Sequence, residues 1–317
     1  MRAPRLRVVI TATAVAVAIG GSALAAPALS AAPAAAVTER IDGGSSPSAI
    51  TGMWAWGNPI DPAVDARGEG LAQFEPQALA DFAAAHHLRT VFLSVPWAAD
   101  EGPFGAWLTD AIHALHAVGV TKVAALGGDP SWADDPSLAA DWTAAALRAA
   151  PFDAIQFDVE PWVVSSDSEL PAVVTKLQNL YDQARVAAGS TPVGADLPWW
   201  LAAKPQPEGG TAFDALLPHL KSVAIVAFSD HADGTDGIVA LAQPAAAAAA
   251  AKRIPFTIGV ETDTPEVAGG AAATFGDDSA ALLESETTKV RSQLSGLRGY
   301  GGVTVEHLLA WQDLLAR

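Results

Sequence analysis

The chain contains no cysteine among its 317 residues. This absence excludes disulfide bonds, thiolate metal ligands, a cysteine nucleophile and a lipid-modified cysteine behind a leader segment. Positive charge is also scarce, because 18 Lys and Arg stand against 35 Asp and Glu and give a formal net charge of −17. So acidic a chain is a poor partner for phosphate backbones and anionic lipid, and we expect it to bind no nucleic acid.

The N-terminal residues have the pattern of an export signal. Three arginines within the first seven residues precede an apolar run at residues 8–19, and Ala23-Leu24-Ala25 follows, with a small residue at each end of the triplet. This order predicts a secretory signal peptide over residues 1–25, so the protein is expected to be secreted or associated with the cell wall. The apolar run is too short to span about 30 Å of hydrocarbon comfortably, and we expect no membrane span in the mature form.

The rest of the chain divides into a short tether and one large domain. Residues 26–50 are rich in Ala, Pro, Gly and Ser without a persistent period, which predicts a disordered tether. Over residues 51–317, short apolar runs alternate with helical segments, and half of the whole chain is hydrophobic. This alternation is typical of parallel βαβ units. The strands are expected at residues 53–56, 90–95, 122–126, 154–159, 192–196, 223–228, 256–260 and 302–305.

Eight strand–helix units of similar size favour an α/β fold closed into a single (β/α)8 barrel, a TIM barrel, which commonly takes about 250 residues. An open doubly wound sheet is the alternative, but no G-x-G-x-x-G motif follows an early strand. The alanine run at residues 245–251 is expected to belong to the sixth helix. Further helices are expected at residues 76–86, 104–117, 138–149, 170–188, 280–294 and 307–316.

The end of the fourth strand carries the most informative residues. Side chains alternate along a strand, so Gln156, Asp158 and Glu160 share one face and the apolar residues between them share the other. In barrels of this kind, polar residues at the C-terminal ends of strands point into the active site. Two such close, partly desolvated carboxylates do not both ionise easily, so one pKa should rise, and Glu160 is the candidate general acid.

The segment D-A-I-Q-F-D-V-E, which ends at Glu160, resembles the D-G-x-D-x-D-x-E signature of family 18 glycoside hydrolases, the chitinase and endo-N-acetylglucosaminidase group. Leu126-Gly127-Gly128 resembles the family's S-x-G-G, and Asp230 lies where its M-x-Y-D places an aspartate. The resemblance implies that Glu160 protonates the glycosidic oxygen. It also implies that Asp158 orients the substrate's N-acetyl group, whose oxygen attacks the anomeric carbon.

The chain departs from that family pattern at several positions. Gln156 replaces the middle aspartate, Ala154 replaces the glycine, Ser229 stands at the tyrosine position, and the tryptophan of the final strand is not evident. These departures keep open a second function class, a catalytically inactive, lectin-like barrel that binds carbohydrate without cutting it. A lectin needs only aromatic surface and hydrogen bonds, whereas catalysis needs Glu160 and a second working carboxylate.

A second resemblance concerns Val159-Glu160-Pro161, which is similar to the Asn-Glu-Pro that ends the fourth strand of clan A retaining glycosidases, although the Asn is missing. Glu261 ends the expected seventh strand, where that clan has its nucleophile. A separation of about 5 Å between the two carboxyl groups would suit a retaining reaction, and about 6.5–9.5 Å an inverting one. Glu160 is the acid in both schemes.

Further acidic and aromatic residues are expected around the same mouth. Asp196 and Glu306 end two other strands and are candidate substrate ligands, while Asp230 and Glu261 are further catalytic candidates. An indole face packs well against the C–H face of a sugar ring and leaves its N–H free for a hydroxyl. Seven tryptophans lie at or just after expected strand ends, namely Trp54, Trp56, Trp97, Trp132, Trp162, Trp199 and Trp200.

The sequence therefore predicts a secreted, monomeric glycoside hydrolase that cleaves O-glycosidic bonds of a polysaccharide or N-acetylated glycan. Its partner would be the carbohydrate substrate, with Glu160 as general acid and Asp158 as its helper. His86, His87 and His231 have no metal-ligand spacing, so we expect neither a metal ion nor another cofactor.

Overall fold

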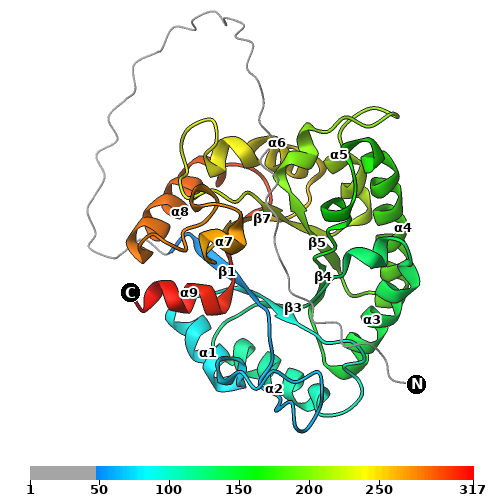
Figure 1. Ribbon diagram of the computed structural model, residues 1–317, viewed down its shortest axis with the longest axis vertical. Coiled ribbons are helices and arrows are strands. Elements are labelled where there is room, and N and C mark those ends of the chain that lie inside the picture. The colour runs from blue at the N-terminus through cyan, green and yellow to red at the C-terminus, as the bar shows by residue number, and fades with distance from the viewer. Residues whose placement is uncertain (1–47) are drawn as a thin grey trace, which may run out of the picture.

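The computed structural model describes residues 48–317, so the expected signal peptide and nearly all of the expected tether lie outside the described residues. The described chain forms a closed barrel of parallel strands in sequential order, surrounded by helices (Figure 1). This confirms the predicted TIM barrel. The strands are β1 (Ile50–Ala55), β2 (Thr90–Ser94), β3 (Lys122–Gly127), β4 (Ala154–Phe157), β5 (Val193–Pro198), β6 (Ser222–Val226), β7 (Phe256–Glu261) and β8 (Tyr300–Glu306).

The helices mostly follow the predicted periodicity. Those at residues 104–117, 170–188 and 280–294 have the expected bounds, and the alanine run lies in the helix between β6 and β7. Two details differ, since the helix after β5 has only five residues and a short extra helix follows β7. The helices are α1 (Pro76–Ala85), α2 (Phe104–Ala117), α3 (Pro136–Ala149), α4 (Leu170–Ala188), α5 (Ala212–Leu216), α6 (Ile238–Lys252), α7 (Pro265–Ala268), α8 (Ala280–Leu294) and α9 (Leu308–Leu315).

A large hydrophobic core lies between the strands and the ring of helices. Aromatic rings fill it beside β4, where the Phe157 ring lies 5.7 Å from that of Trp142 and 6.1 Å from that of Tyr181. The outward-facing residues of β4 therefore bind the strand to α3 and α4. This packing fixes the position at which β4 ends and its acidic residues begin.

The barrel interior is a separate, smaller apolar cluster built around one tryptophan. Trp54 from β1 is fully buried there with Phe92, Leu126 and three alanines. Glycine supplies the room, because a Cβ atom on Gly259 would lie 2.9 Å from the Trp54 ring. Trp54 thus closes the barrel beneath the C-terminal ends of the strands.

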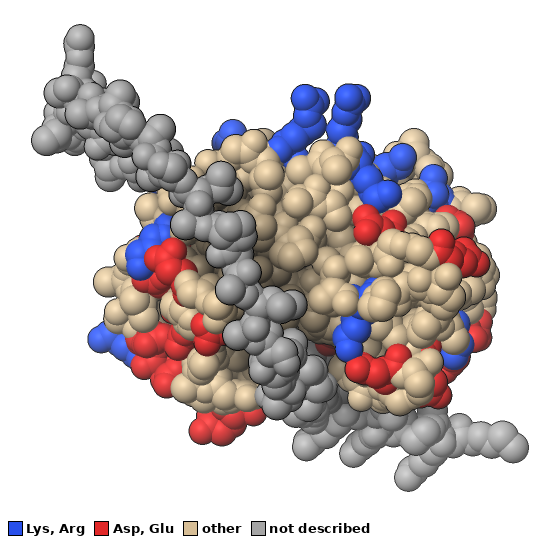
Figure 2. Space-filling view, turned by 90° about the horizontal axis from the view of Figure 1, so that it is seen from above, with Lys and Arg blue, Asp and Glu red and all other residues tan. Residues whose placement is uncertain are grey.

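The outer surface is mixed in charge despite the acidic composition. The side shown in Figure 2 has Lys and Arg at its upper edge, residues of both signs on its flanks, and uncharged residues between them. Within residues 48–317, no helix combines the length and the apolar character needed to cross a membrane.

The role of the β4 aromatic packing can be tested by Phe157→Ala. Because the ring is fully buried among other rings, its removal should lower the free energy of unfolding by about 3–5 kcal/mol in a denaturant titration. Val186→Ala is the control, since this α4 side chain is 84% exposed and should change stability by less than about 0.5 kcal/mol. A Phe157→Ala cost below about 1 kcal/mol would contradict this packing.

Candidate active site

Two glycines at the end of β3 allow the acidic end of β4 to pack closely. A Cβ atom on Gly127 would lie 2.4 Å from the Trp142 ring, and one on Gly128 would lie 1.7 Å from the Asp158 carbonyl oxygen. The Asp158 N–H donates to the Gly127 carbonyl at 3.1 Å, so the pairing with β3 continues past the last residue of β4. Any side chain at these two positions would therefore clash with Trp142 or with the Asp158 backbone. The two glycines allow β3 to lie close enough to hold the Asp158 backbone by a hydrogen bond.

Asp158 and Glu160 follow β4 as the alternation predicts, although β4 is two residues shorter than expected. Glu160 is the residue before a 3₁₀ turn at Pro161–Val164, where the chain leaves the barrel. Both side chains retain partial exposure at the mouth. Among the described residues, no hydrogen bond to the Asp158 carboxylate is found, which leaves its oxygens open to a ligand.

Asp196 on β5 lies deeper and is held by two donors inside the barrel. The Gln156 side-chain N–H donates to its Oδ1 at 2.8 Å, and the Trp54 indole N–H donates to its Oδ2 at 3.0 Å. Only 3% of Asp196 is exposed. Gln156, the most evident departure from the family 18 signature, therefore has a partner in this chain, a carboxylate on the neighbouring strand.

Glu261 and Glu306 face each other from neighbouring strands, since their Cα atoms are partners in the β7–β8 register. Glu261 Oε1 accepts the backbone N–H groups of Thr262 at 2.7 Å and Asp263 at 2.8 Å. The Trp56 indole N–H donates to Glu306 Oε1 at 3.3 Å. The two carboxylates are thereby fixed at one side of the barrel mouth.

These five residues, Asp158, Glu160, Asp196, Glu261 and Glu306, are called the carboxylate cluster below. Burial is the largest cause of a raised pKa in all of them, and repulsion from other acidic groups adds to it in all but Glu160.

The carboxyl groups of the cluster differ in how far their pKa values rise. The pKa values of Asp158 and Glu306 lie well above their usual range, and those of Asp196 and Glu261 rise to about 7. Burial also raises the pKa of Glu160, while a hydrogen bond from the Trp162 side chain opposes the rise. The cluster therefore retains protons near neutral pH and can donate one, which is what a general acid requires.

One cation faces the cluster from below. Lys122 begins β3 at the other end of the barrel, and its Nζ lies 5.5 Å from the centre of the Phe92 ring. Burial lowers the pKa of Lys122, while its charge lowers that of Asp196. Sequence reasoning missed this residue because it begins a strand rather than ending one.

The predicted tryptophans divide between the mouth and the interior. Trp162 and Trp200 are half-buried and meet edge to face, with ring centres 5.7 Å apart. Trp56 and Trp199 are also half-buried, and Trp97 is 48% exposed. These five retain surface that a ligand can reach.

Trp54 and Trp132 differ from that expectation. Trp54 fills the barrel interior and is 1% exposed, so it reaches the site only through its N–H on Asp196. Trp132 is 8% exposed and packs against Trp142, with ring centres 5.6 Å apart, and against Phe157. Its ring belongs to the hydrophobic core rather than to the mouth, because the 3₁₀ turn that carries it folds back on α3.

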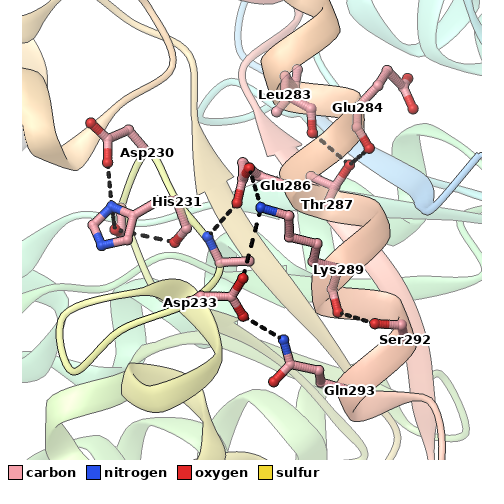
Figure 3. A network of polar contacts seen from close by, with 12 residues as sticks. Asp230, His231, Asp233, Leu283, Glu284, Glu286, Thr287, Lys289, Ser292 and Gln293 are labelled. Atoms are coloured by element: carbon pink, nitrogen blue, oxygen red, sulfur yellow. Dashed lines mark hydrogen bonds and ion pairs between the residues drawn. The ribbon is translucent and has the colours of Figure 1, made fainter.

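Asp230 lies in the loop between β6 and α6 and is paired with a histidine instead of the cluster. Its Oδ1 lies 2.5 Å from His231 Nδ1, and this contact raises the pKa of His231. The buried Glu286 of α8 ties this loop to the helix, because it accepts the Ala232 N–H at 2.8 Å. Figure 3 shows a second tie, in which the Lys289 ammonium lies 2.8 Å from Glu286 and 3.7 Å from Asp233 of the loop. The sequence did not indicate this contact between the loop and α8, because Glu286 is one of several charged residues on a polar helix.

The site offers no evident metal centre. Within the described part of the chain, no three or more His, Asp or Glu side chains are grouped so that they could hold a metal ion. What the arrangement can do chemically is donate and accept protons and bind polar groups at a mouth bordered by indoles.

No family model matches the chain, and no curated protein matches it either. Among solved structures, a GH18 chitinase from Pseudoalteromonas aurantia aligns with a TM-score of 0.50 at 12% identity, over 82% of this chain and 94% of that one. A putative deoxyribose-phosphate aldolase from Toxoplasma gondii aligns with a TM-score of 0.52 at 11% identity, over 84% and 90%. The spore cortex-lytic enzyme SleL from Bacillus megaterium aligns at 0.46 and 10%, over 82% and 70%.

The chain is thus a TIM barrel that resembles family 18 chitinases in structure, as the sequence predicted, and an aldolase to the same degree. At these identities the likeness shows the fold alone, because one barrel architecture supports many reactions. The chemistry must be argued from the carboxylate cluster.

The raised pKa of Asp196 predicts how stability depends on pH. Its folded-state value of about 7 exceeds the ordinary 3.8, so between these values the folded protein binds the proton more tightly than the unfolded chain. Raising the pH from about 4 to about 7 should therefore remove on the order of 2–4 kcal/mol of unfolding free energy through Asp196.

Denaturant titrations at several pH values will measure this loss. Asp196→Asn should lose less stability over the same interval, whereas Asp110→Asn, on the exposed side of α2, should follow the wild type. Equal pH slopes in Asp196→Asn and the wild type would show that Asp196 titrates normally.

Proposed function

We propose that the protein is a secreted glycoside hydrolase that cleaves O-glycosidic bonds of a polysaccharide or N-acetylated glycan. The observation that carries the proposal is the pair Asp158 and Glu160 at the C-terminal end of β4, inside a cluster whose burial raises every carboxyl pKa. Export is supported by the residue pattern of positions 1–25, and the half-buried indoles Trp56, Trp162 and Trp200 support a sugar ligand.

In the proposed reaction, protonated Glu160 gives its proton to the glycosidic oxygen as the bond to the anomeric carbon breaks. The leaving sugar departs as an alcohol, and Glu160 is left as a carboxylate that takes a proton from the incoming water. Asp158, which has open oxygens beside Glu160, would orient an N-acetyl group whose oxygen attacks the anomeric carbon.

The aldolase-like fold makes carbon–carbon cleavage the reaction to weigh against this one. Such chemistry commonly uses a lysine that forms a Schiff base with a carbonyl substrate. The lysine inside the barrel, Lys122, stands at the start of β3, whereas barrel active sites lie at the C-terminal ends of strands. Lys204, near the mouth, is engaged with Asp167 at 2.7 Å. The position of the acids and of these lysines favours the glycosidase.

A barrel that binds glycan without cleavage is the second candidate. Gln156 favours it, because an amide stands where the related enzymes have an acid and is hydrogen-bonded to Asp196. Both candidates predict sugar binding, and they differ in whether Glu160 transfers a proton.

Glu160→Gln distinguishes the two. The change keeps the shape of the side chain and removes its proton, so kcat on a panel of polysaccharides, including chitin and N-glycans, should fall about 10²- to 10⁴-fold. Release of reducing ends measures the reaction, and binding of the same glycans should persist in the variant.

Glu208→Gln is the matched control. Glu208 is exposed in the loop after β5. Its substitution removes the same charge as Glu160→Gln but far from the acids, so activity should remain within about two-fold of the wild type. Glycan binding without cleavage by the wild type would reject the hydrolase in favour of the lectin-like barrel, and activity preserved in Glu160→Gln would reject Glu160 as the acid.

A further inference from the structure

The side of the carboxylate cluster away from β4 has features that the proposed reaction leaves unused. Glu261 and Glu306 are register partners on β7 and β8, and neighbouring strands lie about 4.8 Å apart. Trp56, after β1, completes this side, because β1 pairs with β8. Three consecutive strands therefore bring two carboxylates and one indole together.

Each of the two carboxylates is fixed through one oxygen and open at the other. Glu261 Oε1 accepts two backbone N–H groups, and Glu306 Oε1 accepts the Trp56 N–H. Among residues 48–317, no donor to the second oxygen of either carboxylate is found. The backbone below is also held, since Thr262 donates from its N–H and its hydroxyl to the Glu306 carbonyl, both at 2.7 Å. The pair is rigid and has unused acceptors.

No cation within residues 48–317 offsets the mutual repulsion of this pair, so it keeps protons near neutral pH. The pKa of Glu306 is raised well above its usual range by burial and then by Glu261, Asp158, Asp196 and Glu160. The nearby His307 contacts Asp263 at 3.2 Å, and Asp263 adds to the repulsion on Glu261. A ligand that brings one positive charge would stabilise the ionised form of these acids and displace a proton from them.

We infer that Glu261 and Glu306 form a subsite for the ammonium group of an unacetylated hexosamine. The inference rests on the proposed function, because the cation must be part of a sugar for Trp56 to support it with apolar ring surface. An ammonium has three N–H donors, two of which can go to the two open oxygens of the carboxylates, and charge-assisted bonds of this kind are strong. The substrate class is then an aminoglycan that carries free amino groups, fully or partly deacetylated.

The test compares two ligands of one length, a fully deacetylated and a fully N-acetylated glucosamine hexamer. Calorimetric titration is done on the full chain with Glu160→Gln, so that neither ligand is cleaved. The deacetylated hexamer should bind at least about ten-fold more tightly, and added salt should weaken its binding more than that of the acetylated one.

Glu306→Gln and Glu261→Gln, each added to Glu160→Gln, test the two carboxylates. Each should weaken the deacetylated hexamer about ten-fold or more and the acetylated hexamer less than about two-fold. Glu208→Gln in the same background should leave both affinities unchanged. Thermal unfolding of each variant verifies that it is folded. If the variant at one of the two glutamates fails to fold, the variant at the other glutamate tests the subsite.

The outcomes separate this inference from the proposed function. Equal affinity for the two hexamers, or equal weakening of both in the variants, overturns the subsite even if the wild type hydrolyses glycans through Glu160. A preference for the deacetylated hexamer that depends on Glu306 supports the subsite. If the wild type then cleaves neither hexamer, the result counts against the hydrolase.

Discussion

The constraint on which the upper half of this barrel depends is the burial of five carboxylates at one mouth, with one lysine of residues 48–317 beneath them. Buried charge is costly unless it is paired or protonated. The chain meets the cost with neutral donors, namely the Trp54 indole and the Gln156 amide on Asp196 and the backbone N–H groups on Glu261. What these donors do not offset appears as raised pKa values, so the cluster keeps protons and remains receptive to positive charge.

Fold and site are joined at Trp54. Its ring closes the interior of the barrel, and its N–H reaches Asp196 at the level where the mouth begins. Outside the strands, Phe157 and Trp142 pack β4 against α3. Gly127 and Gly128 have no side chains, so the end of β3 lies in close contact with Trp142 and with the Asp158 backbone. The acids are therefore positioned by apolar packing on both sides of the sheet, as a preorganised site requires.

The barrel was predictable because its signals are local and repeated: short apolar strands, helices of period 3.6 and polar residues at strand ends. The same logic identified Asp158, Glu160, Asp196, Glu261 and Glu306 one by one. Their common mouth was also expected, because strand ends meet there, but the pairing of Glu261 with Glu306 required strand register. The burial of Trp54 and Trp132 required knowledge of where a ring points after the strand ends. Lys122 and Glu286 act through partners 74 and 54 positions away, on Asp196 and Ala232 (196 − 122 and 286 − 232), and no sequence period reports such contacts.

One glycine in the barrel interior shows how size on one strand determines acidity on another. Gly259 leaves no room for even a methyl group beside the Trp54 ring, so a larger residue on β7 requires a smaller one on β1. A smaller residue at position 54 would take away the indole donor of Asp196 and leave that carboxyl with the amide of Gln156 alone. A larger residue at position 259 would therefore change the proton affinity of Asp196, because the residue at position 54 contacts both.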